Sequence, residues 1–174
     1  MKKALLIISI LSIIFLTGCG IFKIDGWIWP EDDLEFMDMV EELNTPQKVS
    51  DYMMENFEYE LHNLWTPTPY FLWKRGKGDC NDFATFGVFI AHYHGYETYQ
   101  IIISYIDAST KHMIAVYVEE ELSFTDNRSY HYGFDSFREI VEFDCKYFPD
   151  KEIKKYIVKD YENNIIEVRD NYVH

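Results

Sequence analysis

Cysteine is scarce in this chain, with 3 among 174 residues. Only Cys80 and Cys145 lie outside the N-terminal segment, which is too few for the disulfide framework of a small secreted domain. One Cys80–Cys145 bridge is compatible with an oxidising compartment. A buried structural thiol and a reactive thiol are the other interpretations of Cys80.

Basic residues are also few, 16 against 30 acidic residues, and the formal net charge is −14. Such an acidic surface argues against nucleic acid as a partner and against loose binding to anionic lipid. It would favour cationic, for example lysine-bearing, substrates at long range. The sequence contains no internal repeat, no low-complexity region and no calcium-loop pattern.

The N-terminus begins with a short apolar run. Ala4 to Leu16 is apolar apart from two serines and follows the basic pair Lys2 and Lys3. A basic start, a short apolar region and small residues after it describe a secretion signal and are too short for a spanning helix.

The end of that segment, Leu16-Thr17-Gly18-Cys19, resembles a bacterial lipobox, in which the cysteine is lipidated and becomes the mature N-terminus. We therefore predict a lipoprotein signal peptide over residues 1–18 and lipidation of Cys19. An ordinary signal peptide that is cleaved nearby, or an uncleaved anchor, is the alternative.

Removal of residues 1–18 leaves 156 residues with a formal charge of −16, because Lys2 and Lys3 are the only charged residues lost. This length suits one domain with a substantial core. We predict a lipidated N-terminus and tether over 19–30 and a single domain over 31–174. The lipid alone would hold the protein to the cell membrane, on its extracytoplasmic face.

Helical spacing dominates the first half of the domain. Asp33 can cap a helix that runs to about Leu43, and Thr45-Pro46 is a strong start for a second helix. Residues 70–74 fit a brief helical turn. The longest helix is predicted over 81–94, with an apolar surface wide enough for burial on most sides and Gly95 placed to end it.

Strand-like runs dominate the second half, with one further helix. Extended runs are predicted over 99–106, 112–118 and 121–126, a helix over 135–143, and a terminal hairpin of two strands, 156–161 and 165–169. Helices followed by consecutive strands predict an α+β domain with an antiparallel sheet.

A possible nucleophile lies at the start of the longest helix, in the run Gly78-Asp79-Cys80-Asn81-Asp82-Phe83-Ala84. Thiols react as thiolates, and a helix N-terminus favours the charged form through its macrodipole. The unpaired N–H groups there, including that of Cys80, can hold an oxyanion. Asp79 and Asp82 are most simply explained as capping residues.

His112 and Asp126 are the predicted partners of Cys80. His112 begins one strand-like run, and Asp126 ends the next. If these runs pair as a hairpin around Glu119-Glu120, the two side chains become neighbours, as a base and its orienting carboxylate must. Asn127 is a weaker candidate for the acid. The other histidines do not head a strand after the helix: His62, His92, His94, His131 and His174.

These residues together resemble the transglutaminase-like superfamily, in particular its small bacterial members of cysteine-peptidase type. The resemblance covers roughly residues 45 to 145 and is carried by the cysteine motif, then a histidine heading a strand, then an aspartate ending another. It implies a papain-like core, with the nucleophile helix packed on an antiparallel sheet. It also implies a second oxyanion donor from a side chain upstream of Cys80, for which Trp65 and Tyr70 are the candidates.

The function that follows is a lipid-anchored thiol enzyme outside the cytoplasm, with a triad of Cys80, His112 and Asp126 acting on a peptide or protein substrate. It would form a thioester resolved by water or by an amine, and the resemblance favours water. Maturation of a partner protein is a variant of this function. We expect no cofactor and no metal. The alternative is a non-catalytic surface module that binds peptide or cell-wall ligands.

Overall fold

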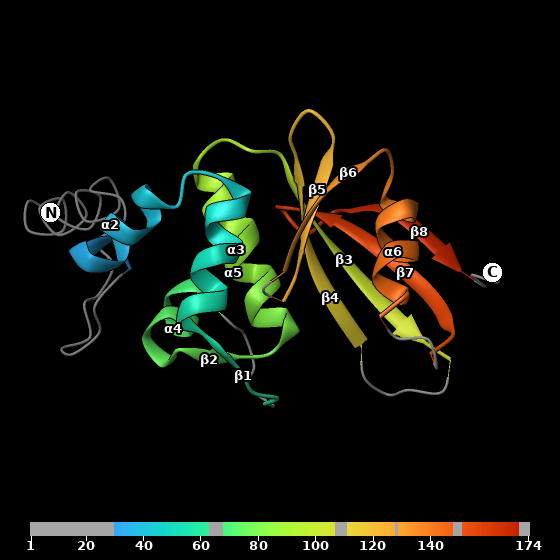
Figure 1. The fold of residues 1–174 in the computed structure, drawn as a ribbon, viewed down its shortest axis with the longest axis horizontal. Coiled ribbons are helices and arrows are strands. Elements are labelled where there is room, and N and C mark those ends of the chain that lie inside the picture. The colour runs from blue at the N-terminus through green and yellow to red at the C-terminus, as the bar shows by residue number, and fades with distance from the viewer. Residues whose placement is uncertain (1–29, 63–67, 107–110, 128, 148–150, 171–174) are drawn as a thin grey trace, which may run out of the picture.

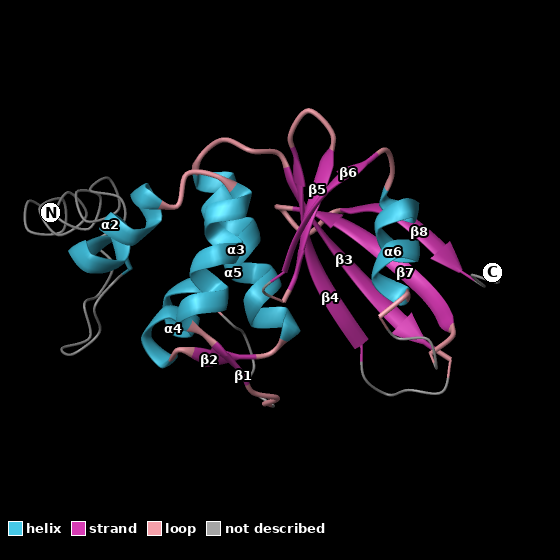
Figure 2. Ribbon diagram, in the orientation of Figure 1, coloured by secondary structure: helices cyan, strands magenta, loops and turns pink. Residues whose placement is uncertain are grey.

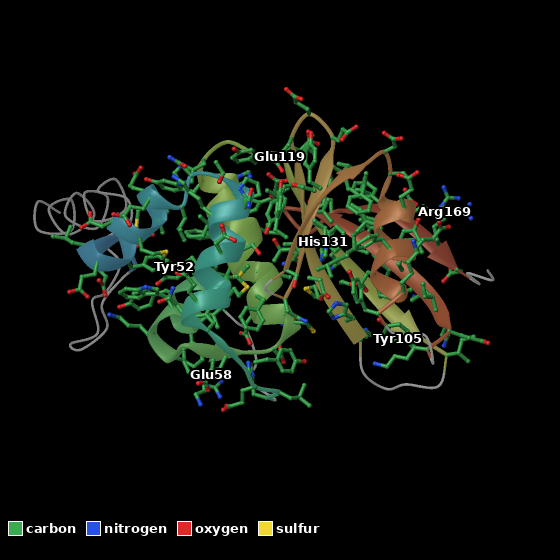
Figure 3. All side chains as sticks on the ribbon, in the orientation of Figure 1. Tyr52, Glu58, Tyr105, Glu119, His131 and Arg169 are labelled. Atoms are coloured by element: carbon green, nitrogen blue, oxygen red, sulfur yellow. The ribbon has the colours of Figure 1, made fainter. Side chains whose placement is uncertain are left out.

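The computed structural model describes residues 30–62, 68–106, 111–127, 129–147 and 151–170. The predicted signal peptide, Cys19 and Trp65 lie outside these ranges, as does His174. The described chain forms a group of helices from its first half and a sheet from its second half (Figure 1). Figure 3 shows the same division at the level of side chains, with Tyr52 among the helices and Tyr105 among the strands.

Local capping signals explain where the early helices begin. The Asp33 side chain accepts from the Phe36 amide at the start of one helix, and Thr45 and Thr68 cap the next two, each followed by a proline in the first turn. These elements are η1 (Pro30–Asp32), α2 (Leu34–Glu42), α3 (Pro46–Asn56) and α4 (Pro69–Arg75).

A short parallel pair of strands leads into the longest helix. β1 (Glu58–Tyr59) pairs with β2 (Lys77–Gly78), and α5 (Cys80–Tyr93) follows two residues later. The helices pack around one apolar cluster whose largest members are aromatic. Its fully buried members include Phe36, Phe83 and Phe86.

The second half forms a six-stranded antiparallel sheet in the order β6-β5-β4-β3-β7-β8 (Figure 2). Its strands are β3 (Thr98–Tyr105), β4 (Lys111–Val118), β5 (Leu122–Asp126), β6 (Ser129–Phe134), β7 (Ile153–Asp160) and β8 (Ile165–Asp170). β3, β4 and β5 follow one another as hairpins, and β7 returns beside β3.

The two faces of this sheet bury different helices. Ala115 and Tyr117 of β4 pack with residues of α5, whereas Ile114 and Val116 belong to the cluster that includes Ile140 of α6 (Phe137–Cys145). Alternate residues of a strand point to opposite faces, so β4 contributes to both clusters. The side chains of β4 thereby connect the nucleophile helix with the layer formed by α6.

The structure confirms the α+β class and the nucleophile helix on an antiparallel sheet. The predicted helices after Asp33 and Thr45, the three consecutive strands and the terminal hairpin are all present, with ends displaced by a few residues. Two strands, β2 and β6, were not predicted. β2 has only two residues and no periodic signal. β6 lies at the sheet edge with low burial, although Tyr130, Tyr132 and Phe134 alternate along it with polar or small residues, which is a strand signal.

Within the described ranges, no helix has both the length and the apolar character that crossing a membrane requires.

Candidate active site

Cys80 is the first residue of α5, and a complete capping box holds this helix start. The Asp79 carboxylate accepts from the Asn81 amide at 3.0 Å, and the Asp82 carboxylate accepts from the Asp79 amide at 2.8 Å. The Asp79 side chain also accepts from the Asp82 amide, and the Asp79 carbonyl accepts from Phe83. The Cys80 amide is thus the N–H group of the first turn that neither the cap nor the helix uses.

Two glycines bring the chain to Cys80 for different reasons. Gly76 ends α4 with a positive φ of 68°, a conformation that glycine adopts without strain. Gly78 is required by space, because a Cβ atom there would lie 2.7 Å from the Asp82 side chain and 2.8 Å from Leu72. A left-handed backbone conformation therefore explains Gly76, and close packing explains Gly78.

His112 and Asp126 lie together as the hairpin predicted. Nε2 of His112 is 2.8 Å from Oδ1 of Asp126. β4 and β5 pair through Ala115 and Thr125, so one further step of the register sets Asp126 opposite Ile114, diagonal to His112 on the same face. The carboxylate can therefore fix the tautomer and orientation of the ring.

The electrostatic surroundings of His112 favour the imidazolium. Burial alone would lower its pKa, but interactions with Asp126, Asp144 and Cys80 outweigh it and raise the pKa well above the usual value. The ring is buried, with 8% of the residue exposed. A protonated imidazole beside a thiol is the arrangement that stabilises a thiolate.

Cys80 and His112 line the same cleft, which has a volume of about 800 Å³. The Cys80 side chain is half-buried, and its Sγ lies 3.8 Å from the Lys111 carbonyl oxygen. The other lining residues come from β1, the start of α5 and the ends of the neighbouring strands: Tyr59, Leu61, Asp79, Asn81, Ile102, Tyr105, Lys111, Met113, Asn127 and Lys151. The cleft has the size of a small-molecule or peptide side-chain site.

The structure does not bring Tyr70 to this cleft. Its hydroxyl donates to Asp33 at 2.9 Å, and its ring packs edge-on against Phe36 among the helices. Tyr70 is therefore withdrawn as an oxyanion donor, and Trp65 lies outside the described residues. Helical spacing did not reveal this, because the Asp33 contact joins residues 37 positions apart.

Tyr59 is a cleft residue that the sequence did not single out. Burial and the nearby Cys80 and Asp79 raise its pKa, and its ring stacks on Phe83. It lies on the parallel pair β1–β2, a two-residue element with no periodic signal. Asn127 also reaches the cleft, with φ at 50°, directly after Asp126.

The two cysteines are both free, so the alternative of a Cys80–Cys145 bridge is wrong for this structure. Cys145 is buried in α6, and burial, followed by the charge of Asp144, raises the pKa of its thiol to about 12. Cys145 is thus unsuited to reaction as a thiolate.

The described competing histidines are engaged elsewhere. His94 contacts the Val40 carbonyl oxygen at 2.7 Å, His92 stacks on Tyr161, and His131 stacks on Phe124. His62 pairs with Asp82, behind the cap of α5. None of these four lines the cleft with Cys80.

Asp144 of α6 is the second acidic residue beside His112 and was not predicted from the sequence. Its Oδ1 lies 3.7 Å from His112 Nε2, and its side chain is fully buried. A signal was present, because Asp144 follows Ile140 and Val141 at helical spacing and therefore belongs to the buried stripe of α6.

Two groups of side chains have metal-ligand types within 4.8 Å of one another. They are His62, Asp79 and Asp82, and His112, Asp126 and Asp144. In each group the histidine contacts one carboxylate, and Asp79 and Asp82 also accept from backbone amides at the cap of α5. We assign no metal to either group.

The model of the family described as "Transglutaminase-like domain" matches residues 33–154, most of the described chain. The chain belongs to this family. Comparison with curated proteins finds no match. Among solved structures, LapG of Legionella pneumophila is 16% identical, with a TM-score of 0.47 over 68% of this chain and 70% of that chain. Its EGTA-treated form is 15% identical, with a TM-score of 0.49 over 77% of each chain.

Proposed function

We propose that this transglutaminase-like domain is a thiol enzyme that cleaves peptide amide bonds, with Cys80 as nucleophile, His112 as acid and base, and Asp126 as the carboxylate that orients His112. The observation that carries this proposal is the convergence of the three residues, 46 positions apart in sequence at the extremes, at one cleft. Cys80 and His112 line it, and Asp126 contacts the ring at 2.8 Å.

In the first half-reaction, the Cys80 sulfur attacks the carbonyl carbon of the peptide bond. The oxyanion that forms accepts from the Cys80 amide, which the cap leaves unused. The His112 imidazolium then gives its proton to the amide nitrogen, the C–N bond breaks, and the amine leaves. The product is a thioester on Cys80 and a neutral imidazole on His112.

In the second half-reaction, water attacks the thioester carbonyl while His112 accepts a proton from it. The C–S bond breaks, a carboxylic acid leaves, and the Cys80 thiolate with the His112 imidazolium is restored. An amine in place of water would give transamidation. We favour hydrolysis because the family resemblance is to members of cysteine-peptidase type.

The cellular setting belongs to the same proposal. The lipobox-like ending at Cys19 supports a lipid anchor outside the cytoplasm, which would bring the cleft to peptide or protein substrates there. Replacement of Cys19 by Ala should release the protein from the membrane fraction and abolish labelling by a palmitate analogue. Retention in that fraction would contradict the anchor and leave the chemistry at Cys80 untouched.

Two measurements test the chemistry. In the folded protein, iodoacetamide should alkylate Cys80 much faster than the buried Cys145, and His112→Ala should slow the reaction of Cys80, whereas His92→Ala, on the exposed end of α5, should not. Cleavage of a peptide library should disappear in Cys80→Ala. Equal reactivity of the two thiols and an unchanged cleavage pattern in Cys80→Ala would refute the enzyme. Ligand binding without turnover would support the binding module instead.

A further inference from the structure

Asp144 is a carboxylate at a position where burial is energetically unfavourable for a charged group. It lies on the buried face of α6 beside Ile140, Val141 and Cys145, in the apolar cluster between this helix and the sheet. The residue has no exposed surface, and neither carboxylate oxygen has a hydrogen-bond partner among the described residues. Burial of an ionised carboxylate without compensation is strongly unfavourable, so an apolar side chain would serve the packing better.

Among the titratable groups around Asp144, His112 is the one that can supply a positive charge. Nε2 of His112 in β4 lies 3.7 Å from Asp144, and Asp126 of β5, a second carboxylate, lies 2.8 Å from the same nitrogen. His131 of β6 also faces it, but burial lowers the pKa of His131 and keeps it neutral near pH 7. The Tyr105 hydroxyl of β3 and the Cys145 thiol of α6 complete the surroundings, and both have raised pKa values.

We propose that Asp144 is a positioning residue for the reaction at Cys80: a second carboxylate, supplied by α6, that holds His112 in its imidazolium form together with Asp126. This inference rests on the proposed function, because it assigns Asp144 an effect through His112. Asp126 contacts the ring at hydrogen-bond distance and sets its orientation. Asp144, at a distance too long for a hydrogen bond, acts through its charge.

The topology explains why a residue of α6 can do this. His112 shares a face of β4 with Ile114 and Val116, and that face is covered by α6. Cys80 comes from α5, which packs against the opposite face through Ala115 and Tyr117. The imidazole therefore lies between a thiol that approaches from α5 and a carboxylate that approaches from α6.

The contribution of His112 to the pKa of Asp144 supports the same role, although burial raises that pKa overall. His112 lowers it. A carboxyl in this position loses its proton at lower cost when the imidazole beside it is charged, and the imidazolium is in turn stabilised by the carboxylate. Removal of either charge should therefore shift the pKa of the other group.

The test is a titration of the His112 ring by NMR, in the Cys80→Ala protein, with and without Asp144→Asn. Loss of the Asp144 charge should lower the pKa of His112 by about one unit or more, a tenfold weaker binding of the proton. Cys145→Ala, the neighbouring buried position on the same helix, should leave that pKa unchanged. An unchanged His112 pKa in Asp144→Asn, with a lowered one in Asp126→Asn, would overturn the proposal.

Two further measurements cover other outcomes. If Asp144→Asn does not fold, Asp144→Ala replaces it. Independently, in the chain that keeps Asp144, the ¹³C chemical shift of the Asp144 carboxyl should change over the pH range in which His112 titrates. A carboxyl shift that stays constant over that range would overturn the role of Asp144. Alkylation of Cys80 in the native protein separates this result from the proposed function. A reactive Cys80 with no Asp144 effect refutes only the role of Asp144, and an inert Cys80 with a shifted His112 refutes only the enzyme.

Discussion

His112 Nε2 lies 2.8 Å from Asp126 Oδ1, although 14 residues separate them in the chain. The hairpin of β4 and β5 creates this contact, because its register sets the two residues on one face of the sheet. The pair is therefore as rigid as the central strands that carry it, whereas Cys80 is held by a different element.

Asp126→Asn keeps the shape of the side chain and removes its charge. The pKa of His112 should fall, since Asp126 raises it, and less of the Cys80 thiol should be ionised. We expect alkylation of Cys80 at pH 6 to slow by about 10- to 100-fold. Asp135→Asn, on an exposed turn, is the control. Equal alkylation rates in Asp126→Asn and the native chain would show that the contact does not support the thiolate.

The free energy of unfolding should depend on pH through His112. Its folded pKa is raised above the unfolded value of about 6.5, so the stabilisation is complete below that pH and is lost as pH rises toward the folded pKa. The free energy of unfolding should fall between pH 6.5 and 8.5, by up to about 1.4 kcal/mol per pH unit. Denaturant titrations of the native chain and His112→Gln measure this, and the fall should be smaller in the variant. Parallel curves would contradict the assigned cause.

Asp79→Ala removes the cap of α5 and should have two effects. The free energy of unfolding should decrease by about 1 kcal/mol, and the first turn, with the Cys80 amide and thiol, should lose its fixed position. Slower alkylation of Cys80 should accompany the loss of stability. Ser136→Ala removes the cap of α6 in the same way. It should cost similar stability without a change at Cys80, and an equal effect of both variants on Cys80 would trace the loss to stability alone.

Tyr59→Phe tests the hydroxyl of the tyrosine that β1 contributes to the cleft lining. If this hydroxyl contributes to oxyanion binding, the variant should lower kcat on a cleaved peptide by about 100-fold with little change in KM. Tyr93→Phe, an exposed tyrosine of α5 that bonds to Glu41, is the matched control. Full activity in Tyr59→Phe, with loss only in Tyr59→Ala, would assign Tyr59 to packing on Phe83.

The sequence predicted the parts of this structure that depend on local signals. Caps and apolar spacing identified the helices, and the predicted hairpin correctly set His112 beside Asp126. The same signals could not reveal β2, which is only two residues long. β6 did have a local signal, since Tyr130, Tyr132 and Phe134 alternate along it with polar or small residues. Local signals also could not show the role of Gly78, because its reason is the distant contact with Leu72.

The candidate site has local signals for only some of its residues. A motif of consecutive residues marks Cys80, and strand ends mark its two partners. Tyr59 and Asp144 reach the site through tertiary packing from β1 and α6, and neither has a local signal for proximity to the cysteine. Tyr70 is the opposite case. Its position upstream of the cysteine suggested an oxyanion donor, but its hydroxyl contacts Asp33 among the helices and not the cleft.

Cys80 begins α5, whose Phe83 belongs to the apolar cluster among the helices, whereas His112 lies on the face of β4 whose Ile114 belongs to the cluster with α6. The proposed chemistry therefore depends on the third cluster, in which Ala84 and Val88 of α5 pack on Ala115 and Tyr117 of β4. A small shift there would separate the Cys80 sulfur from the His112 imidazole while the other two clusters stayed intact. Turnover should accordingly vanish on gentle warming before circular dichroism records any melting. Activity would then report a change in the packing of α5 on β4 that circular dichroism does not detect.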